Sequence, residues 1–537
     1  MTYSQHWEAL EARAEQFAAP EKHLRHLITS PGRVDAFSLC AAGLFYDFSR
    51  QRVDEKTLDL LHALAKASGA ADRSQKMLGG EKVNQSENRA ALHTACRDQS
   101  PDPTLVDGGD VKPDLLAINR RIARFADDIH AGRLTGTSGK PFRHAVVIGI
   151  GGSYLGTQFI AHALRHRAHR GLQLHFLSNV DSHNFGEIAA AIDPETTLWI
   201  VISKSYTTAE TLANTKQAYQ YMGECGLDPA RHVVTVTSKG SPGDDPDNPV
   251  LATFHMFDFI GGRFSVTSAV GGVPLSLYLG YDCFAELLQG AAAMDRHAAE
   301  APAEQNLPLT AALINVWNTS FLKYPATAVV PYAAPLDKLA AHIQQLSMES
   351  NGKAATFDGK PHLGGSGGFI FGEPGTNAQH SFFQMAHQGK PLPIEFIGVL
   401  NSAYPRFQST SQGVTNHQEL WANLIAQADA LASGKKDADP ARTFSGNRPS
   451  ATIVIEALSP ANVGALLAFY EAKTVYEAFI WGINPFDQFG VELGKQTAAG
   501  LRRAIAGKNV GNSKFPEDLS SINAFYLDML FKGEIPD

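Results

Sequence analysis

The sequence has few cysteines, no excess of basic residues and no long apolar run. Its four cysteines, at positions 40, 96, 225 and 283, match neither a zinc pattern nor a dense disulfide framework, so we expect reduced thiols in the cytoplasm. A long uncharged stretch, residues 264–281, contains glycine, proline and several hydroxyl residues. This composition predicts a buried helix start and disfavours a membrane span.

Basic residues are also too few for a protein that binds nucleic acid through its charge. Lysine and arginine total 46 against 54 for aspartate and glutamate, which gives a net charge of −8. The N-terminal residues mix both charge signs and have no apolar segment, which argues against a signal peptide. With 44% apolar and 19% charged residues, the 537-residue chain has the composition of a globular protein with several domain-sized parts.

Short β-branched runs alternate with amphipathic helical stretches from about residue 143 onward, whereas the first hundred residues have helical periodicity. Such alternation is typical of parallel sheets covered by helices on both faces. We therefore predict an α/β protein with two α/β/α domains. The predicted strands of the first domain are at 145–150, 172–177, 197–202 and 232–238, and those of the second are at 326–332, 394–400 and 450–458.

Two motifs that directly follow predicted strands indicate an anion site. GIGGSYLG (149–156) places small residues before a helix, but Tyr154 stands where a dinucleotide fingerprint needs glycine, and a tight turn without a ligand is the alternative. SKSYTTAET (203–211) places several hydroxyl groups and one lysine at a helix start. The alternative is a polar N-cap that binds no ligand. Two such turns on neighbouring strands favour a phosphate site at the carboxyl ends of the strands.

Two further motifs carry an arginine and a glutamate suited to proton-transfer chemistry. Arg263 in GGRFSVTSAVGG can stabilise a developing oxyanion, although a structural ion pair is the alternative. Glu349 in QQLSMESNGK lies among amide and apolar residues that favour a general base, although most such glutamates are surface charges.

A histidine and a lysine complete the set of candidate groups. His380 follows a Gly/Pro/Asn turn and suits acid–base work better than a metal pair with His387, because no third ligand has a recognised spacing. Lys495 follows Gly494 on an amphipathic helix, where it could act on a sugar ring oxygen or simply be a surface lysine.

Taken together, six segments in order along the chain resemble the signatures of the phosphoglucose isomerase family. They are SENRAALH (86–93), SKSYTTAET, GGRFS, QQxxMESNGK, GTNxQHSFFQ and FDQxGVELGK. The resemblance spans about residues 40 to 498. It implies two sugar-isomerase (SIS) α/β/α domains with parallel-rich sheets, arranged as a helical N-terminal segment over 1–110, a smaller domain over 111–288, a larger domain over 289–505 and a C-terminal helical extension over 506–537.

The same resemblance implies the chemistry and the roles of individual residues. It implies reversible isomerisation of glucose 6-phosphate and fructose 6-phosphate, without metal or nucleotide, in a cytoplasmic homodimer whose His380 reaches the partner's site. Glu349 would move the proton between C2 and C1, Arg263 would stabilise the enediolate, and His380 with Lys495 would open the ring. The substrate-binding residues would be Gly152, Ser153, Ser203, Lys204, Ser205, Thr208, Gly262, Gln345 and Gln488.

The sequence departs from the family pattern at several positions. Thr267 and Phe489 replace tryptophans, Ser205 replaces a threonine, and Ala378 replaces a glycine before Gln379. A glycine at 378 would be needed if φ were positive there.

Other readings of the chain remain open at this stage. A non-isomerase SIS protein that binds a sugar phosphate would share residues 203–208 but would have no reason to carry Glu349, His380 and Lys495. An amidotransferase would need an N-terminal cysteine, and Cys40 does not meet that need. A signalling role outside the cell is a third reading, and a Rossmann dehydrogenase is disfavoured by Tyr154.

Overall fold

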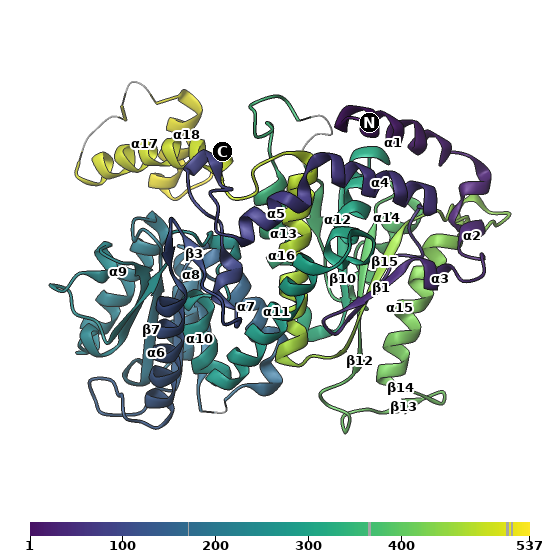
Figure 1. Ribbon diagram of the computed structural model, residues 1–537. Coiled ribbons are helices and arrows are strands. Elements are labelled where there is room, and N and C mark those ends of the chain that lie inside the picture. The colour runs from purple at the N-terminus through teal and green to yellow at the C-terminus, as the bar shows by residue number, and fades with distance from the viewer. Residues whose placement is uncertain (170, 363–366, 512–514, 517–518, 537) are drawn as a thin grey trace. The chain divides into compact units, whose positions relative to one another are not determined.

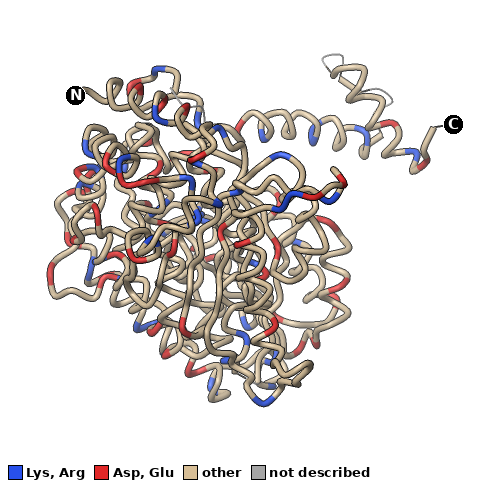
Figure 2. The backbone as a smooth tube through the Cα atoms, turned by 90° about the vertical axis from the view of Figure 1, so that its right-hand side faces the viewer, with Lys and Arg blue, Asp and Glu red and all other residues tan. Residues whose placement is uncertain are grey.

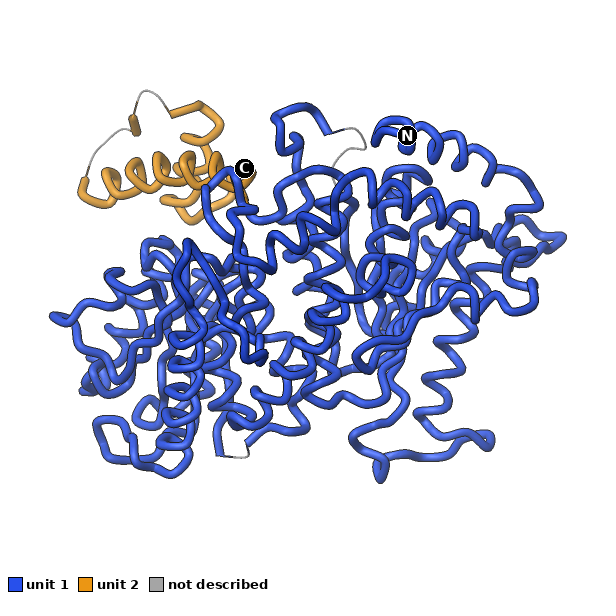
Figure 3. The backbone as a smooth tube through the Cα atoms, viewed as in Figure 1, with its two compact units in different colours: residues 1–486 blue, residues 487–537 orange. Residues whose placement is uncertain are grey.

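The computed structural model describes residues 1–169, 171–362, 367–511, 515–516 and 519–536. Its backbone divides into two compact units, residues 1–486 and residues 487–537 (Figure 3). Each unit is described by itself below.

The first unit contains a five-stranded, fully parallel sheet with the strand order β6-β5-β7-β8-β9. All six residues of the central strand β7 are buried, as expected for a strand covered on both faces. The four strands predicted from the first β-branched runs are confirmed, and β9 is an additional edge strand. The bounds are β5 (His144–Ile148), β6 (Gln173–Leu177), β7 (Thr197–Ile202), β8 (Val233–Ser238) and β9 (Ala252–Met256).

Helices cover both faces of this sheet (Figure 1). Side chains alternate along a strand, so Val147 and Ile200 pack under one pair of helices while Val146 and Trp199 pack under another. The first pair is α6 (Lys112–His130) and α10 (Ala269–Leu279), and the second is α8 (Ser182–Ala191) and α9 (Ala209–Glu224). Helix α7 (Leu155–Ala163) follows β5.

The second sheet has six strands in the order β1-β2-β15-β12-β10-β11, of which β15, β12, β10 and β11 are parallel. The three strands predicted in this part of the chain are confirmed. The bounds are β10 (Ala326–Tyr332), β11 (Phe369–Phe371), β12 (Ile394–Asn401), β15 (Ser450–Ala457), β1 (Ser38–Ala41) and β2 (Leu44–Asp47).

Strands β1 and β2 form an antiparallel hairpin from the region in which we expected only helices. Each has four residues, too few for a two-residue periodicity to stand out in the sequence. β2 forms because its backbone pairs with β15, about four hundred residues further along the chain. The predicted fold class, α/β with two parallel-rich sheets and helical segments at both ends of the chain, is otherwise confirmed.

Six helices pack around the second sheet or in the core beside it: α11 (Tyr281–Glu300), α12 (Leu307–Val316), α13 (Leu339–Asn351), α14 (Phe383–Gln388), α15 (Asn416–Ser433) and α16 (Pro460–Trp481). Helix α16 is buried over nearly its whole length. The N-terminal helices are α1 (Tyr3–Gln16), α2 (Leu24–Leu27), α3 (Arg33–Ala36), α4 (Glu55–Ser68) and α5 (Ala70–Leu78).

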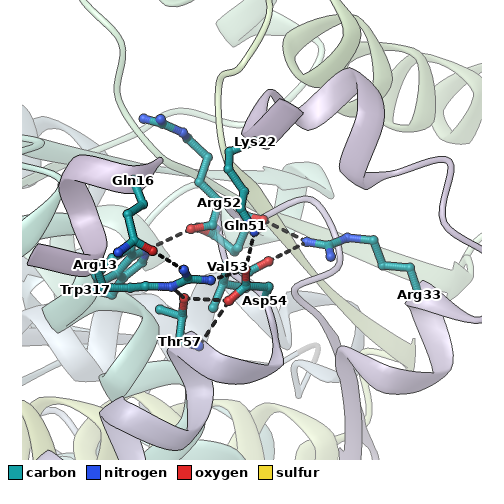
Figure 4. A network of polar contacts seen from close by, with 10 residues as sticks. All are labelled: Arg13, Gln16, Lys22, Arg33, Gln51, Arg52, Val53, Asp54, Thr57 and Trp317. Carbon is teal, nitrogen blue, oxygen red and sulfur yellow. Dashed lines mark hydrogen bonds and ion pairs between the residues drawn. The ribbon is translucent and has the colours of Figure 1, made fainter. Parts of the chain in front are cut away.

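A polar network joins α1 to the start of α4 (Figure 4). Asp54 caps α4 through the backbone amide of Thr57 at 3.1 Å, and it also pairs with Arg13 and, at 2.6 Å, with Lys22. Burial opposes its ionisation, but hydrogen bonds from Arg13, Lys22 and Thr57 outweigh burial and hold the pKa of Asp54 well below its ordinary value. The N-terminal helix is therefore fixed to the first unit by charge as well as by packing.

The second unit consists of α17 (Glu492–Asn509), α18 (Ser521–Lys532) and a short turn before them. In α18 the side chains of Ile522, Phe525, Tyr526 and Leu530 are exposed. The predicted division of the chain at residues 110, 288 and 505 stays a prediction.

Lys and Arg positions are interspersed with Asp and Glu positions along the backbone, in agreement with the slightly acidic balance of the sequence (Figure 2). Within the described residues, none of the helices combines the length and the apolar composition that crossing a bilayer would need.

Helices α11 and α16 touch backbone to backbone. A Cβ atom on Gly290 would lie 1.8 Å from the carbonyl oxygen of Ala461, and one on Gly464 would lie 2.0 Å from that of Leu287. Both helices therefore need glycine at the crossing.

We expect Gly290→Ala to lower the free energy of unfolding by about 1–3 kcal/mol, because the new methyl group must push two buried helices apart. Denaturant unfolding of the purified variant measures this change. The matched control is Gly223→Ala in α9, where a Cβ meets no atom within 4 Å, so that variant should be as stable as the parent or slightly more stable. Equal stability of the two variants would contradict the close-contact argument.

Candidate active site

The candidate residues from the GIGGSYLG and SKSYTTAET motifs lie at the carboxyl ends of β5 and β7, which are neighbours in the parallel sheet. The loop after β5 contains the short helix η4 (Gly151–Ser153), and the loop after β7 contains residues 203–208. Parallel strands end at the same sheet edge, which is where ligands bind in open α/β folds. The predicted meeting of these two motifs is thus present in the structure.

Gly152 touches the segment that follows β9. A Cβ atom on Gly152 would lie 2.2 Å from the carbonyl carbon of Gly262 and 2.6 Å from the amide nitrogen of Arg263. The Ser265 hydroxyl lies 2.6 Å from the Gly262 carbonyl oxygen and 3.3 Å from that of Gly152. The absence of a side chain at residue 152 is what lets the two loops meet.

Residues 203–208 place several hydroxyl groups before α9. The Ser203 hydroxyl accepts a hydrogen bond from the Tyr206 amide at 3.1 Å, and the hydroxyls of Ser205 and Thr207 lie 2.6 Å apart. Thr208 stands at the N-cap position of α9, and its hydroxyl makes no capping hydrogen bond. The positive end of the helix and these hydroxyl donors together favour an anion.

The Lys204 ammonium group joins this loop to the segment after β9. It donates to the carbonyl oxygens of Asp258, at 2.8 Å, and of Ile260, at 3.3 Å, and it lies 3.7 Å from the Asp258 carboxylate. Burial lowers the pKa of Lys204, and the nearby Arg89 guanidinium lowers it further. Lys204 thus braces the backbone that leads to Gly262.

Arg263 is the most deeply buried charged group of the site, with 4% of its surface exposed. Its Nε donates to the Ser350 hydroxyl at 2.7 Å, its Nη2 donates to the Pro485 carbonyl oxygen, and its Nη1 lies 3.3 Å from a carboxylate oxygen of Glu349. A buried cation held from several sides keeps one orientation, which is what stabilising charge on a substrate requires.

Glu349 and Gln345 lie one turn apart on α13. The Gln345 amide donates to Glu349 at 2.8 Å, and the amide nitrogen would lie 3.0 Å from a Cβ atom on Gly151. The Gln345 oxygen is buried and has no hydrogen-bond partner among the described residues. An unsatisfied buried acceptor beside the carboxylate is suited to a ligand hydroxyl group.

His342 lies on the same helix and packs α13 against α7. Its ring stacks on Phe159 with centroids 5.7 Å apart and would be 3.3 Å from a Cβ atom on Gly156. Complete burial lowers the pKa of His342 to about 4. The histidine is therefore neutral in the folded protein near pH 7, and it helps to fix the helix that carries Glu349.

His380 ends the short helix η13 (Asn377–His380). Its side chain is exposed and makes no hydrogen bond or ion pair to another described residue, so the structure does not connect it to Glu349. Ala378 is buried in this helix and is not among the described residues with positive φ, so its backbone conformation does not require a glycine. His387 bonds to Gln427 at 2.8 Å, and the described residues contain no cluster of three or more groups placed to hold a metal ion.

Gln488 and Lys495 belong to the second unit. Gln488 precedes the short helix η15 (Phe489–Val491), and Lys495 is exposed on the first turn of α17. Their roles stay predictions from the sequence.

The sequence motifs missed the groups that hold the candidate residues in place. Ser350 and the Pro485 carbonyl fix Arg263, while the carbonyls of Asp258 and Ile260 hold Lys204. Ser350 lies inside the motif QQLSMESNGK, but the motif did not indicate its role, and backbone carbonyls carry no residue-type signal at all. A cavity of about 430 Å³ lies near Asp98 and Asp295, and none of the candidate residues lines it.

A hydroxyl-rich helix start beside a buried arginine and a carboxylate, on a two-sheet α/β fold, is typical of α/β proteins that handle small phosphorylated molecules. The chain belongs to the phosphoglucose isomerase family, whose model matches residues 47–522.

Individual relatives agree with this assignment over nearly the whole chain. The glucose-6-phosphate isomerase of Desulfosudis oleivorans is 61% identical over 528 residues, which are 98% of this chain and 97% of that protein. The cytosolic glucose-6-phosphate isomerase of Arabidopsis thaliana is 41% identical over 523 residues, 93% of this chain and 92% of that protein. The crystal structure of a glucose-6-phosphate isomerase from Chlamydia trachomatis is similar with a TM-score of 0.88 at 39% identity and 98% coverage of both chains.

Acid should weaken the folded protein partly through His342. Its pKa is lower in the folded state than in the unfolded state, so between about pH 6.5 and pH 4 only the unfolded chain takes up the proton. This group should cost the fold about 2 kcal/mol when the pH falls from 7 to 5. We expect His342→Gln to reduce the difference in unfolding free energy between pH 7 and pH 5 by this amount. The exposed His26 gives the control variant His26→Gln, and an unchanged difference in His342→Gln would contradict the prediction.

Proposed function

We propose that this chain catalyses the reversible isomerisation of D-glucose 6-phosphate and D-fructose 6-phosphate, a step of glycolysis and gluconeogenesis. The observation that carries the proposal is the Glu349 carboxylate 3.3 Å from the buried Arg263 guanidinium, beside a hydroxyl-rich helix start. Aldose–ketose isomerisation needs these elements: an anchor for the phosphate, one base that returns the proton it takes, and a cation for the enediolate oxygen.

The phosphate group is held at the loops after β5 and β7. Hydroxyl groups of Ser153, Ser203, Ser205 and Thr208 donate to it, together with Lys204 and the positive end of α9. Gly152 and Gly262 contribute backbone where the two loops touch, since neither has a side chain to block the sugar. Gln345 and Gln488 position the sugar hydroxyls, and the unsatisfied oxygen of Gln345 supports this role.

Glu349 is the base that moves the proton between C2 and C1 through a cis-enediolate. Its hydrogen bond from Gln345 orients the carboxylate, and Arg263 stabilises the negative charge that develops on the substrate oxygen. In the direction from glucose 6-phosphate to fructose 6-phosphate, C1 is reduced by two electrons and C2 is oxidised by two. The enzyme is therefore an intramolecular oxidoreductase, and the reaction needs no external oxidant or reductant. We propose no cofactor and no metal.

His380 and Lys495 open the sugar ring before the proton transfer. The exposure of His380 and its lack of partners among the described residues support a role in the site of a second subunit. The working form is accordingly a cytoplasmic homodimer that binds small sugar phosphates, with no nucleic-acid or membrane partner. The support for Lys495 and Gln488 is their place in the motif FDQxGVELGK.

A non-isomerase protein that only binds sugar phosphates is the second candidate function. It would need the hydroxyl loop but not an ion pair between Arg263 and Glu349. The identity of this chain with glucose-6-phosphate isomerases also disfavours this alternative.

Glu349→Gln should lower kcat by at least about 10²–10⁴-fold, because the amide cannot accept the proton while its size and its contact with Gln345 are kept. A coupled assay that follows glucose 6-phosphate formed from fructose 6-phosphate, with EDTA present, measures the loss. The parent protein should be active in EDTA, and the exposed Glu15 gives the control Glu15→Gln, which should match it. Saturable fructose 6-phosphate binding without turnover by the parent protein would favour the second candidate function.

A subunit-mixing experiment tests whether His380 acts across the dimer. Glu349→Gln and His380→Ala chains with different affinity tags should each form weakly active homodimers. In the heterodimer, one site combines an intact Glu349 with the intact His380 of the other chain, so about half of the parent activity should return. Recovery of no activity in the purified heterodimer would place His380 in the site of its own subunit.

A further inference from the structure

A small cavity lies behind the last turn of α5, apart from every residue assigned to the sugar-phosphate site. Its volume is about 140 Å³. Its walls include Arg73 and Lys76 from α5, Lys82 from the following loop, and the aromatic rings of Phe357 and Phe479. The lining therefore has three cations and one carboxylate, Glu81. An anion bound in the cavity would balance the excess positive charge.

Arg73 is the least satisfied of these cations. Its guanidinium stacks over the Phe357 ring at 4.6 Å, yet its Nη1 atom is buried and has no hydrogen-bond partner among the described residues. No carboxylate of the described residues forms an ion pair with it, and burial lowers its pKa without any opposing charge. A buried nitrogen without an acceptor is costly, and a nearby negative charge would stabilise this guanidinium, which lines the cavity.

The remaining charges around the cavity leave it positive. Lys76 follows Arg73 by three residues, so both lie on the same face of α5. Lys82 is partly neutralised by Asp107 at 3.0 Å, and both of those side chains are substantially exposed. Lys76 makes no ion pair with a described residue. Glu81 offsets only one of the three cations.

We propose that this cavity is a binding site for a small oxyanion, of the class of inorganic phosphate, sulfate or a short carboxylate. A water molecule takes about 30 Å³ of the liquid, so the cavity has room for four or five waters or for one such anion, but not for a nucleotide. A guanidinium is the side-chain cation best matched to oxyanions, and its position over the Phe357 ring, 4.6 Å from the centroid, holds it at the cavity wall.

The site is distinct from the proposed sugar-phosphate site but lies next to the segment that holds Arg263. Val83 and Gln85 line the cavity and flank Asn84, whose side-chain oxygen accepts from Asn484 at 2.9 Å. The next residue along the chain supplies the carbonyl oxygen that binds Arg263. Because no cavity residue carries a role in the isomerisation, the proposal stands or falls independently of the proposed function.

Equilibrium dialysis with radiolabelled inorganic phosphate on the full-length protein tests the proposal, since it counts bound ions per chain. We expect two sites per chain in the parent: the cavity and the hydroxyl loop. Arg73→Met keeps the aliphatic stem and should weaken one site at least about tenfold. Arg73→Lys should keep part of the affinity. Lys66→Met removes an exposed cation of the neighbouring helix α4 and should retain both sites.

A second variant separates this proposal from the proposed function. Ser203→Ala combined with Thr208→Ala should remove the hydroxyl-loop site and leave the cavity site, which a selenate soak of crystals should then show as an anomalous peak beside Arg73. Loss of all binding in that double variant, or full retention of two sites in Arg73→Met, would overturn the cavity site. A parent that binds a single ion lost only in Arg73→Met would support the cavity and contradict the phosphate role of residues 203–208.

Discussion

The buried guanidinium of Arg263 is the contact on which the rest of the site depends. It follows β9 of the first sheet, yet its partners Glu349 and Ser350 lie on α13, which packs beside β11 of the second sheet. A buried charge is costly unless it is paired and hydrogen-bonded, so the arginine holds both layers to a single arrangement. The glycine contact between residues 152 and 262 then fixes the hydroxyl loops at a set distance from the same group.

Much of the fold could be predicted from the sequence because parallel strands leave a strong local signal. The runs at 145–150, 197–202 and 326–332 are β-branched and buried on both faces, and each became a strand close to its predicted bounds. The place of residues 203–208 before a helix could also be predicted, since hydroxyl groups are favoured at a helix start, and their role as an anion site stays a prediction. The roles of His380 and Lys495 came from the family resemblance, because spacing along a chain does not show which groups share a pocket.

The features that could not be predicted are the long-range ones. Strand β2 is defined by its pairing with β15, and its own four residues carry too little pattern. The Pro485 carbonyl lies 222 residues from Arg263, and a backbone carbonyl is present at every position, so no residue type marks it. Similarly, the ammonium group of Lys204 donates to two carbonyl oxygens after β9, a pairing that depends on the loops after β7 and β9 ending at one sheet edge.

The division of the site between two sheets also restricts how such a protein can be recombined. The first sheet supplies the hydroxyl loop and Arg263, whereas the layer of the second supplies Gln345 and Glu349. A chimera that took each sheet from a different homologue could form every strand and still misplace Arg263 relative to Glu349. It would have to keep the contacts that join the two parts: the backbone of Gly152 against Gly262, and the Ser350 hydroxyl and the Pro485 carbonyl that bind Arg263.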